Sequence, residues 1–438
     1  MTELALALTQ AGIPVMRDEE RVAKLSGDYY HFSPVLTPLL ADKRGDLAVR
    51  PTTEAEVLAI ARLCVQQRVP VTVRGSGTGN YGQCVPLRGG LILDTSGLQR
   101  ILRLENGTAV VEPGVKLGTL ERAAQEQGWE LRMYPSTVRS ATVGGFIAGG
   151  SGGIGSVTWG QLRDRGNLRS VRVVTLETEP QILTLAGDSV QAVNHAYGTN
   201  GILTALEMAL APATPWQETV AVFADFAAAA ALGWALARSD GIAKKLISVF
   251  ESPIPEFFAP LREAVPIGCA CLIAGIGWAD GDTWRAWVQE AGGTLVWDRP
   301  WEGTGALTEL TWNHTTLLAR SRDAAWTYLQ CVYPNLETVA WASRTFAGEL
   351  YQHLEFMRLQ GQPTIGAIPL WRYTTTTRLR AAIAQLEEAG VVVFDPHTYV
   401  LEDGGMKTID RQQADFKQRV DPYGLLNPGK TRAESQSS

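Results

Sequence analysis

The chain has few cysteines, and none of them has a spacing that suits a zinc or dithiol site. Its five cysteines are odd in number and scattered, and Cys269 and Cys271 are separated by a single residue. Sites of the C-x-x-C type are therefore not expected. We interpret the cysteines as free thiols of a reducing compartment, which predicts a cytoplasmic protein.

A long apolar run and an excess of positive charge are also missing. No apolar stretch reaches the roughly 18 residues that a membrane-spanning helix requires, and no basic stretch opens the N-terminus as in a signal peptide. The formal net charge is −6, whereas nucleic-acid binding needs a basic surface. We expect neither a membrane span nor a nucleic-acid partner, although one basic pocket for a small anion is compatible with this charge.

The composition of the chain and the distribution of its glycines predict a globular protein of two domains. Apolar residues make up 45% of the 438 residues and charged residues 19%, which is unlike a disordered chain. Glycine is dense over residues 75–166, whereas residues 215–350 are rich in alanine and tryptophan. This shift places a boundary between two prolines at residue 214. The predicted parts are a first domain of residues 1–214, a second of residues 215–400, and a C-terminal segment of residues 401–438 that returns to the first domain.

Before the boundary the pattern predicts a mixed α+β domain. Thr53 suits the N-cap of a helix whose apolar residues, Val57 to Cys64, have helical spacing. A second helix is predicted over residues 116–127, with Gly128 at its end. Strands are predicted at residues 71–73, 91–94, 108–112, 170–175 and 201–210.

After the boundary the predicted elements follow the order β-α-β-β-α-β, which is that of a ferredoxin-like unit. Its strands cover residues 219–223, 246–250, 270–274 and 294–297, and its helices residues 225–237 and 282–291. A related series has strands at 327–332, 355–359 or 364–369, and 391–394, with helices at 336–350 and 377–389. We expect two such units side by side in one antiparallel sheet, with the helices on one face.

Residues 71–82 have the composition of an anion-binding loop. Alternating glycines follow a predicted strand directly, so consecutive backbone N–H groups can point into one concavity. Arg74 is a nearby cation, and the intervening residues carry hydrogen-bonding side chains. A diphosphate fits this chemistry.

Two stretches, residues 77–82 and 150–155, match G-x-G-x-x-G without the context of a Rossmann fingerprint. That motif must open a helix, whereas Pro86 and two further glycines follow the first match, and no clean strand precedes the second. We therefore reject the Rossmann fold. The glycine-rich stretch 135–155 is either a set of closely packed turns or a second wall for an extended cofactor, and two such loops in one domain favour the cofactor.

The chain resembles the vanillyl-alcohol-oxidase/p-cresol-methylhydroxylase flavoprotein superfamily, particularly its glycolate oxidase and D-lactate dehydrogenase branch. The landmarks are VRPTTEAEV at 49–57, VRGSGTG at 73–79, Pro135-Ser136 with TVGGFIA at 142–148, YGTNGILT at 197–204 and DPYGLLNPGK at 421–430. The resemblance implies an α+β fold: an FAD-binding domain of the p-cresol-methylhydroxylase type and a ferredoxin-like antiparallel substrate domain. It also implies FAD, bound by Arg74, Gly75, Ser76, Gly77, Thr78, Gly79, Asn80, Pro135, Ser136, Thr142, Gly144, Gly145, Ala148, Gly149, Ser151, Gly152, Gly201, Ile202, Asn427 and Lys430.

Some members attach FAD covalently to a histidine of the first loop. Here that position has Ser76-Gly77-Thr78, and neither glycine loop contains a histidine. The resemblance therefore implies non-covalent FAD, with His195 and His397 left open as attachment points. Metal-dependent members carry a spaced histidine pair in the second domain, and no such pair occurs here, so no metal is expected.

Flavin-dependent oxidation of an alcohol needs a base near the hydroxyl, and a hydroxy acid also needs a cation for its carboxylate. His314 is the first candidate base because it lies in the polar run Trp312-Asn313-His314, and His397 is the second. His353 is expected to have no polar cluster around it. A structural histidine is the alternative for each. The candidate carboxylate-binding residues are Arg320, Arg322 and Arg372, for which a solvated surface arginine is the alternative.

The leading hypothesis is an FAD-dependent oxidoreductase that oxidises a small hydroxy acid or alcohol by hydride transfer to flavin. One alternative is oxidation of a sugar or polyol, where hydroxyl-binding side chains replace the arginine. Another is a non-catalytic FAD-binding subunit of an oxidoreductase complex. The substrate, the electron acceptor and the choice between monomer and homodimer stay open.

Overall fold

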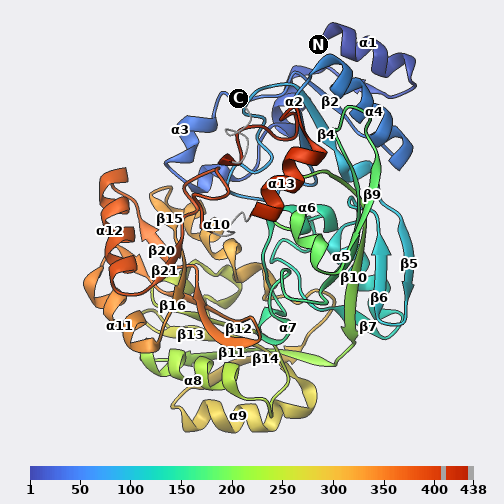
Figure 1. Cartoon of the computed structure of the whole chain (residues 1–438). Helices are drawn as coiled ribbons and strands as arrows, with labels where there is room; N and C mark the ends of the chain where they lie inside the picture. The colour runs from blue at the N-terminus through green and yellow to red at the C-terminus, as the bar shows by residue number, and fades with distance from the viewer. Residues whose placement is uncertain (406–410, 433–438) are drawn as a thin grey trace.

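The computed structural model describes residues 1–405 and 411–432, so the predicted C-terminal segment 401–438 lies partly outside the described residues. Figure 1 shows the sheets with strands β1 to β10 in one half of the molecule and a long sheet with its helices in the other. The chain passes from the first half to the second after β10, and the boundary predicted near residue 214 falls in the loop between β10 and β11.

The first sheet has the strand order β1-β2-β4-β3, in which β2, β3 and β4 are parallel. Helix α4 is capped as predicted, because the Thr53 side chain accepts from the Glu56 amide at 3.2 Å. Its apolar face, from Val57 to Val65, is buried against this sheet. The bounds are β1 Val15–Met16, β2 Leu47–Val49, β3 Val71–Arg74, β4 Leu91–Asp94, α1 Thr2–Gln10, α2 Glu19–Leu25, α3 Leu36–Leu40 and α4 Glu54–Gln67.

The second sheet is antiparallel, with the order β5-β6-β10-β8-β9 and β7 paired to the end of β10. Strand β10 ends at Pro212, whose ring removes a ladder donor, as the sequence predicted. The bounds are β5 Ile101–Glu105, β6 Thr108–Val111, β7 Trp129–Leu131, β8 Leu168–Val174, β9 Ile182–Ala186, β10 Ile202–Pro212, α5 Leu117–Gln125, α6 Val143–Gly149 and α7 Ser156–Trp159.

The long sheet contains eight antiparallel strands in the order β14-β11-β13-β12-β18-β19-β16-β21. Each group of four has the strand order of a ferredoxin-like unit, and β12 pairs with β18 to join the two units. The predicted pair of units is confirmed. The bounds are β11 Trp216–Phe223, β12 Lys244–Phe250, β13 Ala270–Gly277, β14 Thr294–Pro300, β16 Gln330–Tyr333, β18 His353–Leu359, β19 Gln362–Ala367, β21 Val392–Phe394, α8 Phe226–Arg238, α9 Gly281–Glu290, α11 Leu336–Thr345 and α12 Thr376–Glu388.

Helices α8, α9, α11 and α12 lie on the outer face of the long sheet (Figure 1), as expected. Alternate residues of β11 explain how the sheet is packed, because side chains of a strand alternate between its faces. Ala221 and Phe223 pack with the helices, whereas Val220 and Val222 pack in the core that includes the second sheet. The inner face of the long sheet therefore faces the glycine-rich half of the chain.

Three predictions for the second unit needed correction. Residues 327–332 form two strands instead of one, β15 Trp326–Tyr328 and β16, because β15 pairs with β20 Leu370–Arg372 and β16 with β19. The helix predicted over 336–350 ends at Thr345, and β17 Leu350–Tyr351 joins the small sheet β15-β20-β17. The two alternative strands at 355–359 and 364–369 both exist, as the β18–β19 hairpin.

The end of the described chain returns to the first half (Figure 1). Helix α13 Arg411–Val420 is followed by a segment that pairs with β3, since the Asn427 amide donates to the Val71 carbonyl at 2.7 Å. Lys417 on α13 donates to the Thr199 carbonyl at 2.8 Å. The C-terminal segment is thereby attached behind the first glycine loop.

Candidate functional site

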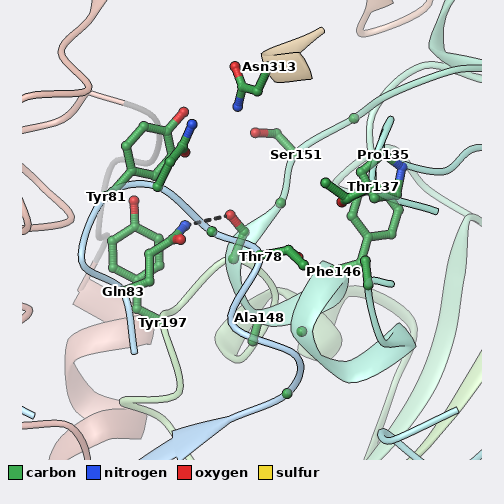
Figure 2. A pocket seen from close by; sticks show the side chains of 18 of the residues that line it. Thr78, Tyr81, Gln83, Pro135, Thr137, Phe146, Ala148, Ser151, Tyr197 and Asn313 are labelled. Carbon is green, nitrogen blue, oxygen red and sulfur yellow. Dashed lines mark hydrogen bonds between the residues drawn. The ribbon is translucent and has the colours of Figure 1, made fainter. Parts of the chain in front are cut away.

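A cavity lies between the two glycine-rich segments and the inner face of the long sheet. Figure 2 shows Thr78, Ala148 and Ser151 from the glycine-rich segments, with Tyr81 and Tyr197 on one side and Asn313 reaching in from the second half of the chain. Because its lining joins the two glycine-rich segments to the second half of the chain, the cavity suits an extended cofactor with a small substrate beside it.

The first glycine loop presents unpaired backbone donors to this cavity. In the part of the chain that the structure describes, the amides of residues 76–80 form no internal hydrogen bond, and all five residues line the cavity. Backbone N–H groups left unpaired in this way need an acceptor from outside the protein. A phosphate group supplies several acceptor oxygens at once.

The two glycine segments approach each other so closely that side chains would separate them. A β-carbon on Gly75 would overlap the Thr142 hydroxyl and come within 3.5 Å of the Gly145 α-carbon. Gly77 has φ of +68°, a conformation that L side chains rarely adopt. The glycines are therefore required both by the backbone conformation and by the contact between the segments.

Arg74 lines the cavity, but its guanidinium is already engaged. It donates to the carbonyls of Leu25, Gly27 and Gly75, and it is almost fully buried. These partners hold the side chain against the loop. Arg74 therefore places a positive charge at a fixed position beside the unpaired amides of residues 76–80.

The second glycine-rich segment contains a helix that the sequence analysis had missed. Residues 143–149 form α6, and Thr142 caps it through a 3.3 Å bond from the Gly145 amide. The interpretation of this stretch as turns is wrong for these residues, because the Thr142 cap and tertiary contacts outweigh the low helix propensity of glycine. Gly144 and Gly145 instead let the helix pack closely against Pro113 and Gly75.

Most of the predicted cofactor residues line the cavity, with the exceptions of Ile202, Asn427 and Lys430. Asn427 donates to the carbonyls of Gln83 at 2.7 Å and Tyr197 at 2.6 Å, and Lys430 donates to the Gly82 carbonyl. These two side chains support lining segments from behind. The lining residues that the prediction omitted include Tyr81, Gln83, Phe146, Gln161 and Tyr197.

The second half of the chain contributes a wall of largely neutral side chains. Trp312 has φ of +52°, and the indole Nε1 of Trp312 and Oδ1 of Asn313 are buried without an internal partner. Burial raises the pKa of Tyr81, while Tyr328, Gln330 and Asn313 lie near its hydroxyl and offset part of this rise. The second-half residues that line the cavity are Trp312, Asn313, Gln330, Cys331, Val332, Glu355, Met357, Leu359, Ala367, Ile368 and Phe394.

Glu355 is held in this wall by three partners. Its Oε1 accepts from the Trp312 amide and from His353 Nε2, both at 2.7 Å, and its Oε2 accepts from the Ser248 hydroxyl at 2.6 Å. The expectation that His353 has no polar cluster around it is therefore wrong. Ser248 on β12 lies opposite Glu355 on β18, and this pairing brings the polar groups together. Because Ser248 is far from residue 353 in the chain, the residues next to His353 did not indicate the cluster.

His314 is turned away from the wall on which its neighbours lie. Its Nδ1 is 2.9 Å from the Ser136 hydroxyl, and its side chain does not line the cavity. Burial lowers the pKa of His314, with the nearby Glu309 carboxylate acting in the opposite direction. The run Trp312-Asn313-His314 thus marks the site, and its first two residues are those that reach the cavity.

His397 is completely enclosed outside the cavity. Its ring nitrogens bond to the Ser33 hydroxyl at 2.8 Å and the Tyr328 carbonyl at 3.1 Å. Burial lowers the pKa of His397 from 6.5 to about 4. Because the ring nitrogens are occupied and do not face the cavity, this position fits a histidine that joins the N-terminal region to β15.

Wild-type protein should lose stability in acid because of this histidine. The unfolded chain binds a proton at His397 below pH 6.5, whereas the folded chain does so only below about pH 4. Lowering the pH from 7 to 4 should therefore cost about 3 kcal/mol of unfolding free energy. Urea unfolding of wild type and His397→Gln at pH 7 and pH 4.5 measures this, and the variant should show the smaller pH dependence. Equal pH dependence in both proteins would contradict the assignment.

The three candidate carboxylate-binding arginines do not line the cavity. Arg320 donates to the carbonyls of Ala324 and Trp326, and Arg372 forms a 2.7 Å ion pair with Asp323. Arg322 is exposed. Arg320 and Arg372 are therefore engaged around the small sheet β15-β20-β17.

Comparison with known proteins finds a family match for part of the chain. The profile of a family described as "FAD binding domain" matches residues 45–182, the part of the chain that carries both glycine segments. The glycolate oxidase subunit GlcD of Bacillus subtilis is 36% identical over 27% of this chain and 26% of its own length. The D-lactate dehydrogenase of Anaerostipes hadrus is 31% identical over 39% of this chain and 37% of its own. Residues 45–182 of the chain therefore match an FAD-binding domain.

Solved structures show the same α+β fold. An alkyldihydroxyacetonephosphate synthase superposes with a TM-score of 0.72, at 18% identity, over 98% of this chain and 85% of that one. Physcomitrella patens BBE-like 1 gives a TM-score of 0.66 at 15% identity. The curated relatives match over less than half of their own length, as for an uncharacterized FAD-linked oxidoreductase of Mycobacterium tuberculosis, matched over 44%.

The matched domain makes FAD the cofactor, and the residues of the cavity fit it. The unpaired amides of residues 76–80 suit the pyrophosphate, and the glycines at 75 and 145 let the two lining segments lie close together. Within residues 1–405 and 411–432 no cluster of three or more His, Cys, Asp or Glu side chains could hold a metal ion. Over the same residues no helix combines the length and apolarity needed to cross a membrane.

Proposed function

We propose that this protein oxidises a CH–OH group of a small hydroxy acid or alcohol, with FAD as the hydride acceptor. The observation that carries the proposal is the shape of the site: one cavity connects the loop of unpaired amides with a wall on the second half of the chain that contains Asn313, Gln330 and Glu355. Relatives named as a glycolate oxidase subunit and as D-lactate dehydrogenase, which match parts of the chain, support this reaction class.

Bound FAD would supply the redox step, because its flavin ring accepts a hydride. The chain's own residues would bind and orient both molecules. The amides of residues 76–80 and the fixed positive charge of Arg74 would hold the pyrophosphate. Tyr81 and Tyr197, both buried, would wall the cavity against water.

We also propose that FAD is bound without a covalent bond. No histidine lines the cavity in the described ranges 1–405 and 411–432. His195 Nδ1 is 2.8 Å from the Gly150 carbonyl, and the ring of His397 is enclosed elsewhere. Acid precipitation should therefore release the flavin into the supernatant.

The decisive experiment is anaerobic reduction of the purified, FAD-loaded protein. Substrate should bleach the flavin absorbance near the visible maximum, and a panel of hydroxy acids, alcohols and sugars identifies the class. A protein that binds FAD stoichiometrically but is not reduced by any member of the panel would favour the second candidate. That candidate is an FAD-binding subunit of a larger complex, to which the word "subunit" in the name of the GlcD relatives points.

A further inference from the structure

The two halves of the cavity differ in charge. Among the described residues of the second half that line it, Glu355 is the charged one. The lining cations, Arg74 and Arg163, both come from the glycine-rich half, and the Arg74 guanidinium is bonded to backbone carbonyls. The substrate end of the cavity therefore has a carboxylate where a hydroxy acid needs a guanidinium.

Glu355 is positioned to accept a further hydrogen bond. Its two oxygens receive three internal donors, from His353, Ser248 and the Trp312 amide. An ionised carboxylate has about four lone-pair sites, so one acceptor site is left for a ligand. The side chain is almost completely buried at the cavity wall, which leaves little solvent to screen its charge.

The groups around Glu355 are neutral donors and acceptors. The Trp312 Nε1 donor and the Asn313 Oδ1 acceptor are buried without an internal partner. Gln330 and Asn313 lie near the Tyr81 hydroxyl. A set of neutral hydrogen-bonding groups with orphaned donors and acceptors is complementary to a molecule with several hydroxyl groups, each of which donates and accepts.

We propose that the substrate is a neutral polyhydroxylated alcohol, a polyol or sugar, and that Glu355 accepts the hydrogen bond and then the proton of the reacting hydroxyl. This inference rests on the proposed function. The step is balanced: the C–H hydrogen leaves with its electron pair to FAD, the hydroxyl proton passes to Glu355, and the alcohol becomes a carbonyl compound. His353, Ser248 and Trp312 are positioning residues, because they act through Glu355.

Charge repulsion sets the size of the expected selectivity. Two negative charges about 5 Å apart at an effective dielectric constant of about 20 disfavour binding by on the order of 100-fold. A hydroxy acid should therefore reduce the flavin much more slowly than the matched neutral alcohol. The comparison uses pairs of similar shape, glycerate with glycerol and gluconate with sorbitol.

The experiment measures flavin reduction by stopped flow in the FAD-loaded wild type and in Glu355→Gln. The wild type should prefer the neutral member of each pair. The variant should lose about 100-fold or more in the rate with neutral alcohols, as when a general base is removed. The ratio of its reduction rate with the neutral alcohol to that with the matched hydroxy acid should also be smaller, since the repelling charge is gone. Glu251→Gln is the matched control, because Glu251 is a partly buried carboxyl beside β12 that does not line the cavity.

The outcomes separate the inference from the proposed function. If wild type prefers hydroxy acids, and Arg163→Ala removes that preference, the substrate class is wrong while FAD-dependent oxidation stands. If Glu355→Gln keeps both the rate and the selectivity of wild type, Glu355 has no role in the reaction. If neither class of substrate reduces the flavin in a fully loaded protein, the proposed function itself fails.

Discussion

Replacing Gly77 with valine should lower the affinity for FAD by about 100-fold or more, equivalent to about 3 kcal/mol. Gly77 has φ of +68°, and a β-carbon there would overlap the Arg74 guanidinium. Arg74 cannot move away freely, because it is bonded to the carbonyls of Leu25 and Gly27. The substitution would therefore distort the row of amides at residues 76–80, each of which would give a charge-assisted hydrogen bond to phosphate.

Titration of the apoprotein with FAD, followed by quenching of flavin fluorescence, measures this affinity. Gly128→Val is the matched control, because Gly128 has φ of +77° but a β-carbon added there would have no atom within 4 Å, and Gly128 does not line the cavity. The control should carry the same backbone strain and keep wild-type affinity for FAD. If Gly77→Val binds FAD as tightly as Gly128→Val, residues 76–80 are not the pyrophosphate loop.

Replacing Lys245 with methionine should destabilise the folded protein by about 3–5 kcal/mol, the usual cost of removing one partner of a buried ion pair. Lys245 on β12 is buried between the two halves of the chain, 3.0 Å from Glu130 on β7 and 3.6 Å from Glu121 on α5. Burial opposes its charge, but Tyr134, Glu121 and Glu130 outweigh this and raise the pKa of Lys245. Without the lysine, both carboxyl groups would be left in a site closed to water.

Urea unfolding followed by tryptophan fluorescence measures the loss, since tryptophans such as Trp284 and Trp371 are fully buried in the folded protein. The double variant Lys245→Met, Glu130→Gln should recover part of the stability, because it leaves one fewer unpaired charge. Lys24→Met is the control, since Lys24 is exposed. If Lys245→Met were as stable as Lys24→Met, the ion cluster would not hold the two halves together.

The local features of the fold could be predicted from the sequence because they depend on neighbouring residues. The short runs rich in apolar residues in β11, β12 and β13 and the helical spacing in α8 and α9 were sufficient to predict the first ferredoxin-like unit. The glycines at 75, 77 and 79 led to the prediction of the anion loop, and each of them lies where a β-carbon would overlap a neighbouring side chain. By contrast, the helix α6 was missed because glycine has low intrinsic helix propensity and tertiary contacts decided its structure.

The sequence by itself predicted the FAD-binding domain and most strands of the long sheet, since these depend on residue types in short stretches. Only the tertiary structure decided which polar side chains meet. Glu355 reaches the cavity beside Trp312 and Ser248 because β18 pairs with β12, and Arg74 is engaged by carbonyls of residues 25 and 27 that lie far from it in the chain. His314 and His397 were chosen for their residue type, and the fold directs their side chains away from the cavity. The direction of a side chain is set by strand register and packing. A short stretch of sequence does not reveal either of these.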